Sequence, residues 1–148
     1  MADILVLHGP NLNLLGEREV DIYGTSSLEE INDKVKKAAA QVQVEVETWQ
    51  SNNEGELIDK IHAARGKSKV IILNPGALTH YSYALRDAIS SVEIPVIEVH
   101  LSNIYAREKW RQKSVTAGAA KGIIAGFGEN SYLLAVEAAL RIIGAKEV

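Results

Sequence analysis

The pattern of apolar and polar positions predicts five short strands along the chain. Residues 4–7 form a continuous apolar run, which is typical of a strand covered on both faces. Residues 42–49 instead alternate between valine and polar side chains, as a strand at the edge of a sheet does. Further apolar runs predict strands at residues 70–73, 96–99 and 122–125.

Helical periodicity fills the intervals between these strands. Ser27 and Glu30 have the spacing of a capping box, and an apolar face follows them to about residue 39. Strands that alternate with helices are typical of a parallel sheet covered on both faces. The sequence therefore predicts an α/β fold, a doubly wound sandwich with a five-stranded parallel sheet in the flavodoxin-like order 2-1-3-4-5. The other predicted helices span about residues 54–65, 81–91, 107–113 and 132–143.

Residues 8–24, after the first strand, contain no helical pattern for about sixteen residues. A loop of this length is usually functional or disordered. It holds Asn11, Asn13, Arg18 and Tyr23. Because ligands of doubly wound sheets bind beyond the carboxyl ends of the strands, we expect this polar loop at the binding edge.

Polar side chains also follow the third and fourth strands. Taken singly, they have simpler explanations, since Asn74-Pro75-Gly76 is typical of a turn and Ser102 or Asn103 of a helix cap. Three strand ends that deliver polar groups to one sheet edge instead favour a site. The candidates after these strands are Asn74, Thr79, His80, His100, Ser102, Asn103, Arg107 and Arg111.

Length and composition limit the classes of protein to consider. The chain has 148 residues, which fit a single domain over residues 1–148. A formal charge of -3 disfavours nucleic-acid binding, and no apolar run approaches the roughly 18 residues of a membrane span. Without a signal-peptide pattern, we expect a cytoplasmic protein that binds neither nucleic acid nor membrane. The chain lacks cysteine and metal-ligand spacing, so we expect neither a metal nor a cofactor.

The groups gathered at the strand ends suit proton transfer on an anionic substrate. Tyr23 accepts a proton only as tyrosinate, an anion that Arg18 and Arg107 would stabilise. His100 can protonate a leaving hydroxyl near neutral pH. A base and an acid without a cofactor indicate elimination of water.

Several sequence blocks follow one another along nearly the whole chain. They are His8-Gly-Pro-Asn-Leu-Asn-Leu-Leu-Gly-Glu-Arg18, Tyr23-Gly24, Asn74-Pro-Gly-Ala77, Thr79-His80, Arg86-Asp87-Ala88, Glu98-Val-His100-Leu-Ser-Asn103 and Arg107-x-x-x-Arg111. Together these blocks resemble the type II 3-dehydroquinate dehydratases. The resemblance implies reversible loss of water from 3-dehydroquinate to give 3-dehydroshikimate through an enolate, in the shikimate route to aromatic amino acids or in quinate breakdown.

The same resemblance implies a role for each site residue. Tyr23 is the base and His100 the general acid, while Arg18 assists the tyrosinate. Asn11 helps to hold a water or oxyanion near the enolate, and Glu98 orients His100. Asn74 also orients His100 and contacts substrate, Leu101 and Ser102 receive the carboxylate, Arg107 binds substrate, and His80, Arg111 and Asp87 bind ring hydroxyls.

The resemblance further implies a lid and an assembly. Residues 17–25 are expected to form the active-site lid, in which Val20 stands where the family often has a more restrictive proline. In this family Asp87 comes from a neighbouring subunit, and the protein is a homododecamer built from four trimers.

Two alternatives stay open. A Schiff-base dehydratase, as in the unrelated type I enzymes, needs a desolvated lysine at a strand end, whereas Lys69 and Lys121 precede their strands. A flavodoxin-like protein that only binds a ligand needs neither an acid nor a base.

Overall fold

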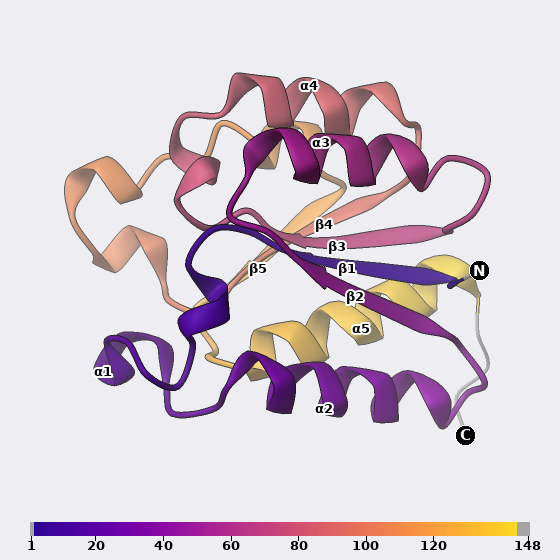
Figure 1. Cartoon of the computed structure of the whole chain (residues 1–148), viewed down its shortest axis with the longest axis horizontal. Helices are drawn as coiled ribbons and strands as arrows, with labels where there is room; N and C mark the ends of the chain where they lie inside the picture. The colour runs from indigo at the N-terminus through magenta and orange to yellow at the C-terminus, as the bar shows by residue number, and fades with distance from the viewer. Residues whose placement is uncertain (1, 145–148) are drawn as a thin grey trace.

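A computed structural model describes residues 2–144 and shows one parallel sheet between two layers of helices (Figure 1). The strand order is β2-β1-β3-β4-β5, and every neighbouring pair is parallel. Both the α/β fold class and the order 2-1-3-4-5 are confirmed. The strands are β1 (Ile4–His8), β2 (Val46–Gln50), β3 (Val70–Asn74), β4 (Val96–His100) and β5 (Gly122–Ala125).

Four longer helices cover the sheet, two on each face (Figure 1). Helices α3 (Glu54–Ala63) and α4 (Tyr83–Ser91) pack on one face, and α2 (Leu28–Ala40) and α5 (Asn130–Ile143) on the other. β1, β3 and β4 are buried along their whole length because helices cover both of their faces. None of the helices in residues 2–144 has the length and apolar character to cross a membrane.

Ser27 caps the start of α2, at the position that the capping-box spacing predicted. Ser27 Oγ accepts a hydrogen bond from the Glu30 N–H at 3.1 Å, and the Ser27 hydroxyl in turn donates to the Glu30 carboxylate at 3.3 Å. These contacts satisfy a donor that the first helical turn would otherwise leave unpaired. Because α2 begins at Leu28, the polar loop that follows β1 must end before this residue.

The predicted second strand was too long at its amino-terminal end. β2 begins at Val46, whereas Val42, Gln43 and Val44 donate their N–H groups back to carbonyls of the last turn of α2. Gln43 has a φ of 60°, which breaks the extended conformation. Val44 is buried in the core, so the valine alternation before residue 46 reflects packing beneath α2 and not a strand.

The structure also differs from the prediction in two segments, one expected to lack a helix and one expected to form a helix. The loop at residues 8–24 contains a short 3₁₀ turn, Leu12–Leu14, and the four-residue helix α1 (Val20–Tyr23). Residues 107–113 form no continuous helix: Arg107 is extended, and Arg111 ends the 3₁₀ turn Lys109–Arg111. Turns of three or four residues are too short to carry an apolar periodicity, so the sequence pattern did not identify them.

Candidate active site

The strand register brings polar side chains together at the carboxyl edge of the sheet. His8 at the end of β1 pairs in register with Asn74 at the end of β3, and β4 ends beside them at His100. A cleft lies beyond this edge. Its lining includes most of the predicted site residues, namely Asn11, Arg18, Tyr23, Asn74, His80, His100, Leu101, Ser102, Arg107 and Arg111.

Two residues to which the family resemblance gives a role lie outside the lining of the cleft, as do the candidates Asn13, Thr79 and Asn103. Glu98 is fully buried and lies behind His100, two residues earlier on β4. Asp87 is exposed on α4. The structure of a single chain therefore joins Glu98 to the cleft through His100 but does not place Asp87 in it.

Tyr23, the last residue of α1, lies between two guanidinium groups. Arg107 Nη1 donates a hydrogen bond to the Tyr23 phenol oxygen at 2.8 Å. Arg107 Cζ lies 5.1 Å from the centre of the Tyr23 ring, and Arg18 Cζ lies 4.7 Å from it. Both guanidinium groups therefore lie within cation–π range of the Tyr23 ring, and one of them also donates to its hydroxyl. The loop and the segment after β4 thus meet at Tyr23, as the sequence had indicated.

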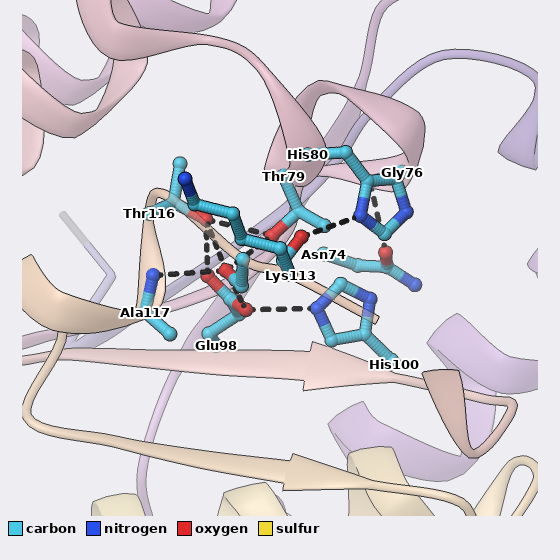
Figure 2. A network of polar contacts seen from close by, with 10 residues as sticks. Asn74, Gly76, Thr79, His80, Glu98, His100, Lys113, Thr116 and Ala117 are labelled. Atoms are coloured by element: carbon cyan, nitrogen blue, oxygen red, sulfur yellow. Dashed lines mark hydrogen bonds and ion pairs between the residues drawn. The ribbon is translucent and has the colours of Figure 1, made fainter. Parts of the chain in front are cut away.

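His100 is held by Glu98 through one of its ring nitrogens. Nε2 lies 2.9 Å from Glu98 Oε2, and Figure 2 shows the other nitrogen pointing away from the carboxylate. A carboxylate only accepts hydrogen bonds, so the proton on this contact resides on Nε2. Nδ1 is therefore the nitrogen left to exchange a proton with a bound ligand.

Hydroxyl groups hold the Glu98 carboxylate from the opposite side (Figure 2). Ser114 Oγ donates to Oε2 at 2.8 Å, Thr116 Oγ1 donates to Oε1, and Thr79 Oγ1 lies within hydrogen-bond distance of both hydroxyls. Burial alone would raise the pKa of Glu98, but its contacts with His100, Thr116 and Ser114 lower that pKa below its ordinary value. Glu98 is therefore a buried anion with a fixed orientation. Sequence reasoning did not identify Ser114 or Thr116.

His80 is fixed by the same segment of chain. Its Nδ1 lies 2.7 Å from the Lys113 carbonyl oxygen, which only accepts, so Nδ1 carries the proton. Burial, together with the positive charges of His100, Arg111 and Arg107, keeps the pKa of His80 below its ordinary value despite the Lys113 contact. In the neutral ring, Nε2 is an acceptor for a ligand hydroxyl.

Trp110 packs between two residues of the cleft. The Trp110 and His80 rings meet at 81° with their centres 5.3 Å apart, and Arg111 Cζ lies over the Trp110 ring, 4.0 Å from its centre. Through these contacts the Trp110 ring holds the Arg111 guanidinium near the His80 imidazole, although the segment is not a continuous helix.

Positively charged side chains line the cleft. Arg18, Arg107 and Arg111 line it, and its described lining contains no aspartate, glutamate or lysine. Arg107 Nη1 also lies 3.4 Å from Ser102 Oγ, so a cation and a hydroxyl adjoin at the end of β4. Such a lining favours an anionic ligand. Within residues 2–144, no three histidine, aspartate or glutamate side chains gather as metal ligands.

Asn74 makes contacts different from those expected. Within the described residues its amide donates to the Tyr132 hydroxyl at 3.0 Å and accepts from the Gly76 N–H at 3.1 Å. Within the described residues, the hydrogen bond that orients the His100 ring comes from Glu98 and not from Asn74. Asn74 remains part of the cleft lining, where a ligand can reach it.

His8 should make folding stability depend on pH. Burial lowers the pKa of His8 from 6.5 to about 4. As the pH falls below 6.5 the unfolded chain binds a proton at His8, whereas the folded chain does so only near pH 4, so stability falls across this window. Between pH 7.5 and 4.5, we expect wild type to lose about 2–3 kcal/mol of unfolding free energy more than His8→Asn. Urea unfolding at both pH values measures this, and equal losses in the two proteins would contradict it.

Fold and site together define a class of protein: a doubly wound α/β protein with a tyrosine between arginines and a carboxylate–histidine pair in one cationic cleft. Comparison with known families identifies the particular family within this class. The family described as dehydroquinase class II matches residues 2–140, and the chain belongs to that family.

Individual relatives agree with this assignment. The chain is 56% identical over 141 residues to a 3-dehydroquinate dehydratase of Pelotomaculum thermopropionicum, covering 95% of this chain and 98% of the relative. It is 54% identical to that of Halothermothrix orenii, covering 97% of each. Among solved structures, the type II dehydroquinase of Butyrivibrio crossotus is similar with a TM-score of 0.90 at 46% identity, covering 92% of this chain and 95% of that one.

Proposed function

We propose that this protein catalyses the reversible dehydration of 3-dehydroquinate to 3-dehydroshikimate through an enolate, with Tyr23 as the base and His100 as the general acid. One observation carries the proposal. The phenol held between Arg18 and Arg107 and the imidazole held by Glu98 line the same cleft. The family and the names of its relatives support the choice of substrate.

The reaction needs two proton transfers. The Tyr23 phenolate removes the proton on the carbon next to the ketone, and the electron pair of that C–H bond moves to form the enolate. The enolate then reforms the ketone as the adjacent C–O bond breaks, and His100 protonates the departing hydroxyl, which leaves as water. Glu98 holds Nε2–H of His100, so the donated proton comes from Nδ1.

Binding follows from the remaining cleft residues. Arg107, Leu101 and Ser102 receive the substrate carboxylate, while His80 Nε2 and Arg111 bind the ring hydroxyls. Asn11 holds a water or the oxyanion beside the enolate. These assignments agree with the three arginines in the cleft lining and with the neutral, acceptor-presenting His80.

We propose that residues 17–25 act as a lid of a single catalytic domain spanning residues 1–148. Within this segment Arg18 and Tyr23 are partly buried, and the other side chains are exposed. Leu12 and Leu15, buried in the core, anchor its amino-terminal side. Val20 is the first residue of α1, a position that accepts proline, so Val20→Pro is expected to restrict the lid.

The assembly is proposed to be a homododecamer of four trimers, in which Asp87 reaches a neighbouring cleft. The exposed position of Asp87 on α4, outside the cleft of its own chain, supports this. Light scattering should give about twelve times the 16.1 kDa chain mass, and a monomer would contradict the proposal.

A Schiff-base mechanism is the alternative enzyme reading. It needs a lysine beside the reacting carbon, and the described lining of the cleft contains none. The lining therefore favours acid–base chemistry over a Schiff base. We propose that the enzyme is cytoplasmic and needs no cofactor.

An ultraviolet assay tests the proposed function and separates it from simple ligand binding. The product carries a conjugated enone that the substrate lacks. Purified protein incubated with 3-dehydroquinate and a metal chelator should produce a steady rise in enone absorbance. A folded protein that produces no rise would show that it does not catalyse this reaction.

A further inference from the structure

A buried chain of hydrogen bonds leads to Asn74 from the face of the sheet opposite Glu98. It joins Asn32 of α2, His8 of β1 and Tyr132 of α5. His8 Nε2 lies 2.7 Å from Asn32 Oδ1, and His8 Nδ1 lies 2.8 Å from the Tyr132 hydroxyl. Asn74 Nδ2 donates to that same hydroxyl at 3.0 Å. We call these four residues the Asn74 relay.

The donors and acceptors in the Asn74 relay have one consistent direction. Asn32 Oδ1 only accepts, so His8 carries its proton on Nε2. Burial keeps His8 neutral because it lowers the pKa to about 4, so Nδ1 must accept from the Tyr132 hydroxyl. The oxygen of Tyr132 then accepts from Asn74 Nδ2. His8 and Tyr132 are fully buried, which leaves water little chance to replace these contacts.

This direction fixes which way the Asn74 amide faces. Rotating the amide by 180° would place Oδ1 against the Tyr132 oxygen, whose proton is committed to His8. It would also place the NH₂ group against the Gly76 N–H, which now donates to Oδ1 at 3.1 Å. Each mismatch leaves a buried polar group unsatisfied, so the present orientation is strongly preferred. The second N–H of Nδ2 then remains for a ligand.

We propose that Tyr132 and His8 are positioning residues, which hold Asn74 so that its amide donates to an oxygen of the substrate. This inference rests on the proposed function only for the identity of the ligand. The relay acts on binding and not on the proton transfers, because it reaches neither Tyr23 nor His100. Its loss should therefore raise KM with little change in kcat.

Tyr132→Phe removes the central hydroxyl while keeping the ring in the core. We expect KM for 3-dehydroquinate to rise about tenfold and kcat to stay within about twofold. Tyr105→Phe is the matched control, since Tyr105 is exposed and outside the cleft lining. In an Asn74→Ala background, Tyr132→Phe should have almost no further effect on KM. Additive effects would mean that Tyr132 does not act through Asn74.

Two substitutions at His8 give a second test that does not depend on Tyr132→Phe folding. His8→Asn places an amide oxygen near the position of Nδ1 and keeps an acceptor for Tyr132, so KM should stay within about threefold of wild type. His8→Leu removes the acceptor, and KM should rise about tenfold. Circular dichroism checks that both proteins fold. Equal KM values for His8→Asn and His8→Leu, in an enzyme whose wild type is active, overturn the relay and leave the proposed function intact.

Discussion

Tyr23→Phe is expected to lower kcat for 3-dehydroquinate by about three orders of magnitude. The variant keeps the ring that packs beside Arg18 and Arg107 but removes the oxygen that takes the proton. KM should change by less than about threefold, because the substrate-binding groups remain in place. Steady-state measurement of enone absorbance gives both constants.

Tyr81→Phe is a suitable control for this variant. Tyr81 is exposed and lies outside the described lining of the cleft, so its kcat should equal that of wild type. If Tyr23→Phe kept more than a tenth of the wild-type kcat, Tyr23 would not be the base.

His100→Ala is expected to lower kcat by about two to four orders of magnitude. The leaving hydroxyl then lacks a proton donor, and water can replace the imidazole only poorly in a partly closed cleft. The substitution also leaves Glu98 without its cationic or N–H partner, although Ser114 and Thr116 still donate to it. We therefore expect a loss of stability of about 1–3 kcal/mol, measured by urea unfolding at pH 7.

The stability loss must be separated from the loss of chemistry. His62→Ala replaces a histidine on the exposed side of α3, away from the cleft, and should leave kcat unchanged. The activity of His100→Ala is assayed at a temperature below its thermal unfolding midpoint, so that the variant stays folded. A kcat above a tenth of the wild-type value under those conditions would exclude His100 as the acid.

The sequence was most informative where a strand meets the site. The continuous apolar run of β1 indicates a central strand, and the alternation around β2 indicates a strand at the edge of the sheet, because a strand covered on both faces is apolar throughout. These two positions led to the predicted strand order. The polar residues after β1, β3 and β4 share one cleft because parallel strands end at the same edge. Both the strand positions and the shared edge follow from the order of the strands along the chain, which can be read from the sequence.

Contacts between distant segments could not be read from the sequence. Thr116 holds Glu98 from a loop eighteen residues later, and Tyr132 reaches His8 across 124 residues. No spacing or periodicity marks such pairs, since they form only when the layers pack. The valines before β2 misled because a buried turn and a strand can share a two-residue alternation.

Isotope exchange tests the central claim, that Tyr23 and His100 perform separate proton transfers, most directly. In D₂O, His100→Ala should still remove the proton next to the ketone of 3-dehydroquinate and return a deuteron, which proton NMR detects as loss of that signal without dehydration. Tyr23→Phe should exchange no faster than buffer. Exchange by Tyr23→Phe at the rate of His100→Ala would contradict the account, because the base would then be another group.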